Sequence, residues 1–64
     1  MQVILPDRST RTLPDETRTI ESLLLELGIR PSGVIVARNG VLVPEDAIAG
    51  GYDKILIIRI AHGG

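Results

Sequence analysis

The chain has 64 residues, of which seven are Lys or Arg, eight are Asp or Glu and none is Cys. A chain of this length buries only about 60% of the surface that its unfolded form exposes, so we expect one small domain over residues 1–64. The basic residues are scattered among acidic ones, which argues against nucleic-acid binding, and the lack of cysteine excludes disulfides, thiol chemistry and cysteine-based metal sites.

The beginning of the chain predicts a β-hairpin. Residues 1–5 predict a strand, which Pro6 and Asp7 end with a turn. Residues 10–13 predict a second strand, and their threonines suit a half-exposed strand at the edge of a sheet.

The clearest predicted element is a short helix that starts after Thr19. The Thr19 hydroxyl is suited to cap this helix, because it can accept a hydrogen bond from a free backbone N–H. Gly28 suits the left-handed position that ends a helix, and Pro31 prevents the helix from resuming. Leu25 lies off the predicted buried face. That face consists of four apolar residues at helical spacing: Ile20, Leu23, Leu24 and Leu27.

The second half of the chain predicts three more strands. Residues 34–37 and 41–43 predict a hairpin, because Asn39-Gly40 suits a two-residue turn in which both positions need a positive φ. We expect one helical turn over residues 47–49. The apolar residues 55–60 predict the last strand.

Together these elements predict an α+β fold with the order β-β-α-β-β-β, in which one helix lies across one face of a mixed sheet of four to five strands. The last strand is apolar on both sides, with Ile55 and Ile57 facing one way and Leu56, Ile58 and Ile60 the other. We therefore expect this strand in the middle of the sheet. Because one helix covers only one face, the second apolar row is expected to be exposed or covered by another protein.

The most informative segment follows this strand and reads Ala61-His62-Gly63-Gly64. A strand that leads straight into two glycines holds a carboxylate on a tail without side chains, and such a tail fits a channel too narrow for other residues. We therefore expect Gly64 to present its carboxylate to the active site of another enzyme. The alternative is a frayed terminus without a function.

The side chains indicate a carrier or binding protein rather than an enzyme. His62, the only histidine, has no serine or thiol nucleophile beside it in a recognisable catalytic arrangement, and a lone histidine in a tail is usually a bystander. No Cys/His cluster suggests a bound metal. No apolar run approaches the roughly 20 residues that cross a bilayer, and no signal-peptide pattern is present. We expect a soluble protein of the cytoplasm that binds no membrane.

Three features of the chain point to a known family: the hairpin of residues 36–44, Asp53 before an Ile-rich last strand, and the final Gly63-Gly64. They resemble the β-grasp sulfur-carrier family, which includes the thiamine-biosynthesis sulfur carrier and the small subunit of molybdopterin synthase, both structural cousins of ubiquitin. The resemblance covers essentially the whole chain and implies a β-grasp fold. The chain length and the Asn-Gly turn favour the thiamine-type carrier. The chain departs from the family at Tyr52, where members usually carry glycine.

This resemblance implies a function for the tail. An E1-like adenylating enzyme would use ATP to convert the Gly64 carboxylate into an acyl-adenylate. A sulfur donor of the desulfurase or rhodanese type would then convert it into a thiocarboxylate. The thiocarboxylate would deliver sulfur to an acceptor synthase in thiamine or molybdopterin biosynthesis, or to a tRNA base. Gly63 and His62 would belong to the tail that enters these active sites, and the carrier itself would bind no cofactor.

The resemblance also implies a docking surface. Ile55 and Ile57 would face the helix. Four residues would form the patch that docks partner enzymes: Ile4, Leu56, Ile58 and Ile60. The alternatives are that these residues simply fill a central sheet, or that they form a dimer interface.

Two other functions remain open from the sequence. A ubiquitin-like protein modifier would use the same tail and the same activation to attach Gly64 to lysines of other proteins. A β-grasp interaction domain would bind a partner without using Gly63 and Gly64. In that case, removal of the two glycines would leave partner binding unchanged.

Overall fold

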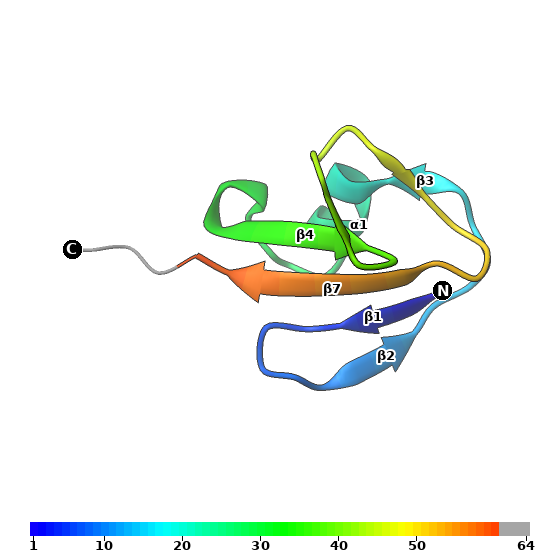
Figure 1. The fold of residues 1–64 in the computed structure, drawn as a ribbon, viewed down its shortest axis with the longest axis horizontal. Coiled ribbons are helices and arrows are strands. Elements are labelled where there is room, and N and C mark those ends of the chain that lie inside the picture. Colours follow the sequence, from blue (N-terminus) through cyan, green and yellow to red (C-terminus); the bar gives the residue numbers. More distant parts are fainter. Residues whose placement is uncertain (61–64) are drawn as a thin grey trace.

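The structure is a computed structural model that describes residues 1–60. It contains a five-stranded sheet, a two-stranded sheet and one α-helix, α1 (Figure 1). The elements in chain order are β1 (Gln2–Ile4), β2 (Thr10–Thr12), β3 (Arg18–Thr19), α1 (Ile20–Glu26), the 3₁₀ helix η1 (Pro31–Gly33), β4 (Val34–Arg38), β5 (Val41–Val43), β6 (Ile48–Ala49) and β7 (Lys54–Arg59).

The last strand lies at the centre of the larger sheet, whose strand order is β2-β1-β7-β4-β5 (Figure 1). β7 runs parallel to β1 and antiparallel to β4, so the sheet is mixed. The predicted α+β class, the mixed sheet and the central place of the last strand are confirmed. The physical reason is that β7 is apolar on both faces, and a central strand has paired neighbours along both edges whose side chains cover part of that apolar surface.

Strand pairing determines which side chains share a face. Ile4 of β1 and Ala37 of β4 lie opposite Leu56 on the two sides of β7, and Ile35 lies opposite Ile58. Because side chains alternate along a strand, these five residues lie on one face of the sheet.

The helix covers the other face. Ile55 and Ile57 of β7 are fully buried, as predicted. They belong to a single core to which α1 contributes its predicted buried face. The core consists of Met1, Val3, Ile20, Leu23, Leu24, Val34, Val36, Ala49, Ile55 and Ile57.

Local signals at both ends of α1 act as the sequence predicts. The Thr19 Oγ1 atom accepts a hydrogen bond from the Ser22 N–H at 3.1 Å, so Thr19 is the N-cap. Gly28 follows the helix with a φ of 75°, in the left-handed region where glycine is favoured. Leu27, at the end of the apolar stripe, is half-buried and packs against the core.

The predicted helical turn over residues 47–49 is wrong, because Ile48 and Ala49 form the short strand β6, which pairs with β3. The backbone hydrogen bonds explain the difference. The Ile20 N–H donates to the Ala47 carbonyl at 2.9 Å, and the Glu21 N–H donates to the Glu45 carbonyl at 2.8 Å. Carbonyls in this segment therefore satisfy the first free amides of α1 instead of continuing a helix of their own.

The hairpin turn at Asn39 also positions the start of β7. Asn39 and Gly40 have φ values of 52° and 85°, which confirms the predicted two-residue turn. The Asn39 Nδ2 donates to Asp53 Oδ1 at 2.9 Å, and its Oδ1 accepts from the Lys54 N–H at 2.9 Å. Asp53 Oδ2 in turn accepts from the Gly50 N–H at 3.1 Å. These bonds hold the turn in which Tyr52 is fully exposed, so the substitution of the usual glycine there does not disturb it.

Acid should weaken the fold in part through Asp53. The hydrogen bond from the Asn39 side chain, together with that from the Gly50 backbone, lowers the pKa of Asp53 below its ordinary value of 3.8. A depressed folded-state pKa stabilises the fold fully above about pH 5, and this contribution is lost as the pH falls through the folded-state pKa. We expect the free energy of unfolding, measured with urea from pH 6 to pH 2.5, to fall less steeply in Asp53→Asn than in the wild type. Parallel pH profiles would contradict this role for Asp53.

The core assignment predicts a large difference between two adjacent leucines. Leu24 is buried, whereas the side chain of Leu25 is 61% exposed. Leu24→Ala should lower the free energy of unfolding by about 2–5 kcal/mol, which is enough to unfold much of so small a domain. Leu25→Ala should change it by less than about 0.5 kcal/mol. Chemical denaturation of both variants makes the comparison, and equal losses would contradict the assignment.

Candidate functional site: the open face of the sheet

The face of the sheet opposite α1 carries a continuous group of apolar side chains. Three of the predicted docking residues, Ile4, Leu56 and Ile58, belong to it. Ile4 is half-buried, and Leu56 and Ile58 are 37% and 40% exposed. The fourth, Ile60, is 39% exposed but follows β7 and lines a hollow on the opposite side of the strand. We call this surface the open face and define it by Ile4, Ile35, Leu42, Leu56 and Ile58.

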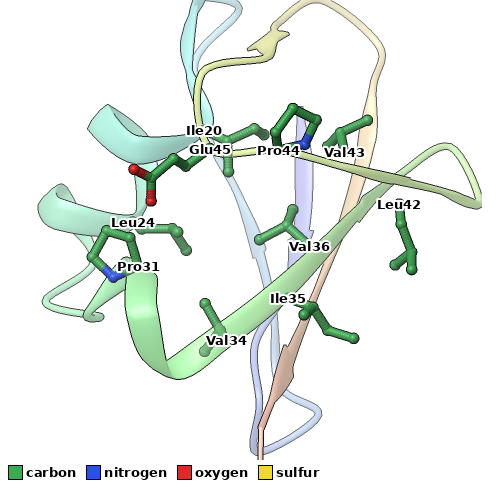
Figure 2. Close-up of a pocket in the computed structure, with 10 residues that line it drawn as sticks. All are labelled: Ile20, Leu24, Pro31, Val34, Ile35, Val36, Leu42, Val43, Pro44 and Glu45. Carbon is green, nitrogen blue, oxygen red and sulfur yellow. The ribbon is translucent and has the colours of Figure 1, made fainter.

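Two members of the open face were not predicted from the sequence. Ile35 and Leu42 are 42% and 64% exposed. Figure 2 shows them pointing away from α1, while Val34 and Val36 point toward it. The alternation of residues 34–37 and the register of the Asn-Gly turn could have placed Ile35 and Leu42 on one face. Only the pairing of β4 with β7 brings Ile35 beside Ile58 and places Leu42 one strand away from Leu56, with Ala37 between them.

A hollow of about 330 Å³ lies on this face where β1 ends. The pairing of β1 with β7 stops at Ile4 and Leu56, whereas β7 continues to Arg59. Ile4, Leu56 and Ile58 therefore border a space that the loop after β1 closes on one side. Arg8 of this loop and Arg59 near the end of β7 are the two charged residues that line the hollow.

A second hollow, of about 400 Å³, lies between α1 and the β4–β5 hairpin (Figure 2). Its walls include core residues such as Ile20, Leu24 and Val36, and Glu45 is the one charged residue among those that line it. A small-molecule site usually has several polar groups that converge on the ligand. We therefore regard the open face as the better candidate site.

The polar and ionisable side chains of residues 1–60 form neither a buried site nor a metal-binding site. Within this part of the chain no polar or charged side chain is buried, and no three His, Asp or Glu residues are grouped to hold a metal ion. The same residues contain no helix long and apolar enough to cross a membrane. Asp7 is exposed, and hydrogen bonds from the Ser9 side chain and backbone lower its pKa. What this surface offers is an apolar contact area flanked by arginines.

The predicted tail residues His62, Gly63 and Gly64 lie outside the described residues. They are nevertheless covered by a comparison with known families, in which the model of the ThiS family matches residues 3–64. No curated protein matches the chain. Members of the ThiS family are sulfur carriers that bind no cofactor, are not enzymes themselves and interact with the E1-like enzymes that activate them. Because the match spans nearly the entire chain and the fold agrees with it, this chain belongs to the ThiS family of β-grasp proteins, which carry sulfur as a C-terminal thiocarboxylate, for example in thiamine biosynthesis.

Proposed function

We propose that the Gly64 carboxylate is the group on which this chain carries sulfur. The observation that carries this proposal is the family match, which includes Gly63 and Gly64. A carboxylate is a poor electrophile until it bears a good leaving group. Its attack on the α-phosphorus of ATP releases pyrophosphate and forms an acyl-adenylate, from which AMP leaves readily.

The sulfur then comes from a donor of the desulfurase or rhodanese type. The terminal sulfur of the donor's persulfide attacks the acyl carbon and expels AMP, and a second thiol cleaves the S–S bond to leave the thiocarboxylate. The carrier needs no cysteine for these steps, and it has none. Gly63 supports entry of the tail into narrow active sites, because glycine has no Cβ. We assign no chemical step to His62.

The proposed acceptor is a synthase of thiamine biosynthesis, the example that the family provides. The proposed compartment is the cytoplasm, where family members generally act and where ATP is at hand. The sulfur donor, the activating enzyme and the synthase would each receive the same tail in turn.

The open face is the proposed docking surface for the activating enzyme. Full burial of an isoleucine side chain stabilises a complex by about 1.5–3 kcal/mol, so burial of the exposed two-fifths of Ile58 contributes roughly 1 kcal/mol. Similar contributions from Leu56, Ile35 and Leu42 give enough gross stabilisation for a transient complex. A contiguous apolar patch on a single domain typically marks such an interaction site.

Deletion of Gly64 should abolish activation and leave the fold intact. The intact mass of the wild type, incubated with ATP, its activating enzyme and a sulfur donor, should increase by one oxygen-to-sulfur exchange. The deletion variant should keep its mass and its melting temperature, because the residue lies beyond the last strand. Sulfur loading of the deletion variant would contradict the role of Gly64. Transfer of the adenylated wild type to lysines would instead indicate a protein modifier.

A charge placed on the open face should weaken docking. Ile58→Asp puts an unpaired carboxylate into the proposed interface and should raise the KM of the activating enzyme for the carrier about 10-fold or more, with little change in kcat. Ile58→Ala, which keeps the strand apolar, should raise it less. The matched control is Ile48→Asp, because Ile48 is an exposed isoleucine of the smaller sheet. If a folded Ile58→Asp carrier has the KM of the control, the docking surface lies elsewhere.

A further inference from the structure

Three arginines surround the end of β7. Arg8 and Arg59 border the hollow on the open face, together with Ile4 and Ile58. Arg59 also borders a second hollow, of about 340 Å³, on the opposite side of the strand, where Arg30 and Ile60 contribute to the lining. We call Arg8, Arg30 and Arg59 the arginine collar.

The charges of the collar are not neutralised by residues 1–60. The ion pairs in this part of the chain join the Met1 ammonium to Asp15 and Arg18 to Glu26. The acid next to Arg8 in sequence, Asp7, is engaged elsewhere, because its Oδ1 accepts from the Ser9 N–H and Oγ at 2.9 and 2.6 Å. All three collar arginines are exposed. The chain as a whole has a net charge of −1, so these three exposed arginines do not reflect a general excess of basic residues.

The backbone of Arg8 gives a second reason to look for a function here. Arg8 has a φ of 72°, a left-handed conformation that favours glycine. It ends a tight turn in which its N–H donates to the Leu5 carbonyl at 2.8 Å, while the Leu5 N–H donates to the Ser9 carbonyl at 2.8 Å. Glycine would make this turn with less strain. An arginine kept in a strained position at the rim of a docking surface suggests that its side chain is used.

We propose that the arginine collar binds carboxylates around the mouth of the channel through which the activating enzyme admits the tail. This inference rests on the proposed function, because it names the chemistry of the partner that binds beside the open face. Guanidinium groups pair well with carboxylates through parallel hydrogen bonds. The collar extends to both sides of the sheet, since Arg8 lies by the open-face hollow and Arg30 by the opposite one. Arginines on opposite sides of the sheet do not converge on one phosphate. They suit a partner whose carboxylates surround the end of β7.

Charges at the rim of an interface act mainly on the association rate and on its salt dependence. The collar would therefore guide the end of β7 toward the channel and hold it there, while the apolar open face supplies the contact area. It would have little influence on the chemical step itself. This separates its effect from that of Gly64, which bears the reacting carbon.

The test measures kcat and KM for the carrier in ATP–pyrophosphate exchange by the activating enzyme, at low salt and at about 0.5 M salt. Arg8→Gln, Arg30→Gln and Arg59→Gln should each raise KM about two- to fivefold at low salt, with kcat unchanged. The triple variant should have a KM about tenfold or more above that of the wild type. High salt should remove most of these differences in KM, because it screens the charges. Arg59→Lys, which keeps the charge, should raise KM less than Arg59→Gln does.

The matched control is Arg11→Gln, which makes the same change in net charge. Arg11 is an exposed arginine of the edge strand β2, level with Val3 rather than with the end of β7. It should retain the wild-type KM. An equal rise of KM in Arg11→Gln would mean that only the net charge of the carrier affects binding. This result would overturn the proposed role of the arginine collar.

Arg8→Gly separates a structural role from a binding role. Relief of the left-handed strain should raise the melting temperature by about 2–6 °C, whereas loss of the guanidinium should raise KM as much as in Arg8→Gln. A more stable variant with the wild-type KM would overturn the role of Arg8.

Two further outcomes would overturn the proposal. The first outcome is that all three collar variants have the wild-type KM at low salt. This result would overturn the proposed role of the arginine collar and leave the proposed function in place. The second outcome is that an enzyme known to activate another carrier does not adenylate the wild-type chain. This result would overturn both the proposed function and the proposed role of the arginine collar.

Discussion

The structure depends on one constraint, which is that β7 is apolar on both sides and residues 1–60 contain a single α-helix to cover it. The helix shields Ile55 and Ile57, and they become the centre of the core. Leu56 and Ile58 alternate with them and must face the other way. Water therefore reaches a group of aliphatic side chains unless another protein covers them. The same strand thus provides both the centre of the core and the proposed docking surface.

β7 also links the docking surface to the tail. Its first residues are paired on both sides, and its last residues remain paired with β4 up to Arg59. The Ile60 N–H continues this pairing by donating to the Gly33 carbonyl at 3.0 Å. The residue from which the tail starts is therefore held at a constant position relative to the open face. A partner that binds the open face receives the tail at a defined place, which lowers the entropic cost of bringing the reacting groups together.

Polar side chains in this domain mainly shape its turns. Asn39 and Asp53 connect the hairpin to the start of β7, and Asp7 holds the first hairpin through Ser9. Each of these residues forms hydrogen bonds that stabilise the turn around it. Arg8 differs, because its left-handed backbone adds strain and its guanidinium forms no ion pair within residues 1–60. A residue that weakens its turn and lies at the edge of the proposed docking surface is better explained by binding than by folding.

Local sequence signals alone were enough to predict three features: the Thr19 cap, the end of α1 at Gly28 and the Asn39-Gly40 turn. Each depends on hydrogen bonds or backbone angles within a few residues. The two-sided apolar pattern of the last strand also predicted its central place, and the family resemblance implied which of its two apolar rows faces the helix. Local propensity failed at residues 47–49, because the Ala47 carbonyl accepts a hydrogen bond from the start of α1, and Ile48 and Ala49 pair with β3. Two groupings appear only in the tertiary structure. Ile35 and Leu42 join the open face through strand pairing, and the three collar arginines lie around the end of β7. The reason is that contacts between residues distant in the chain depend on strand order and register, which no local pattern specifies.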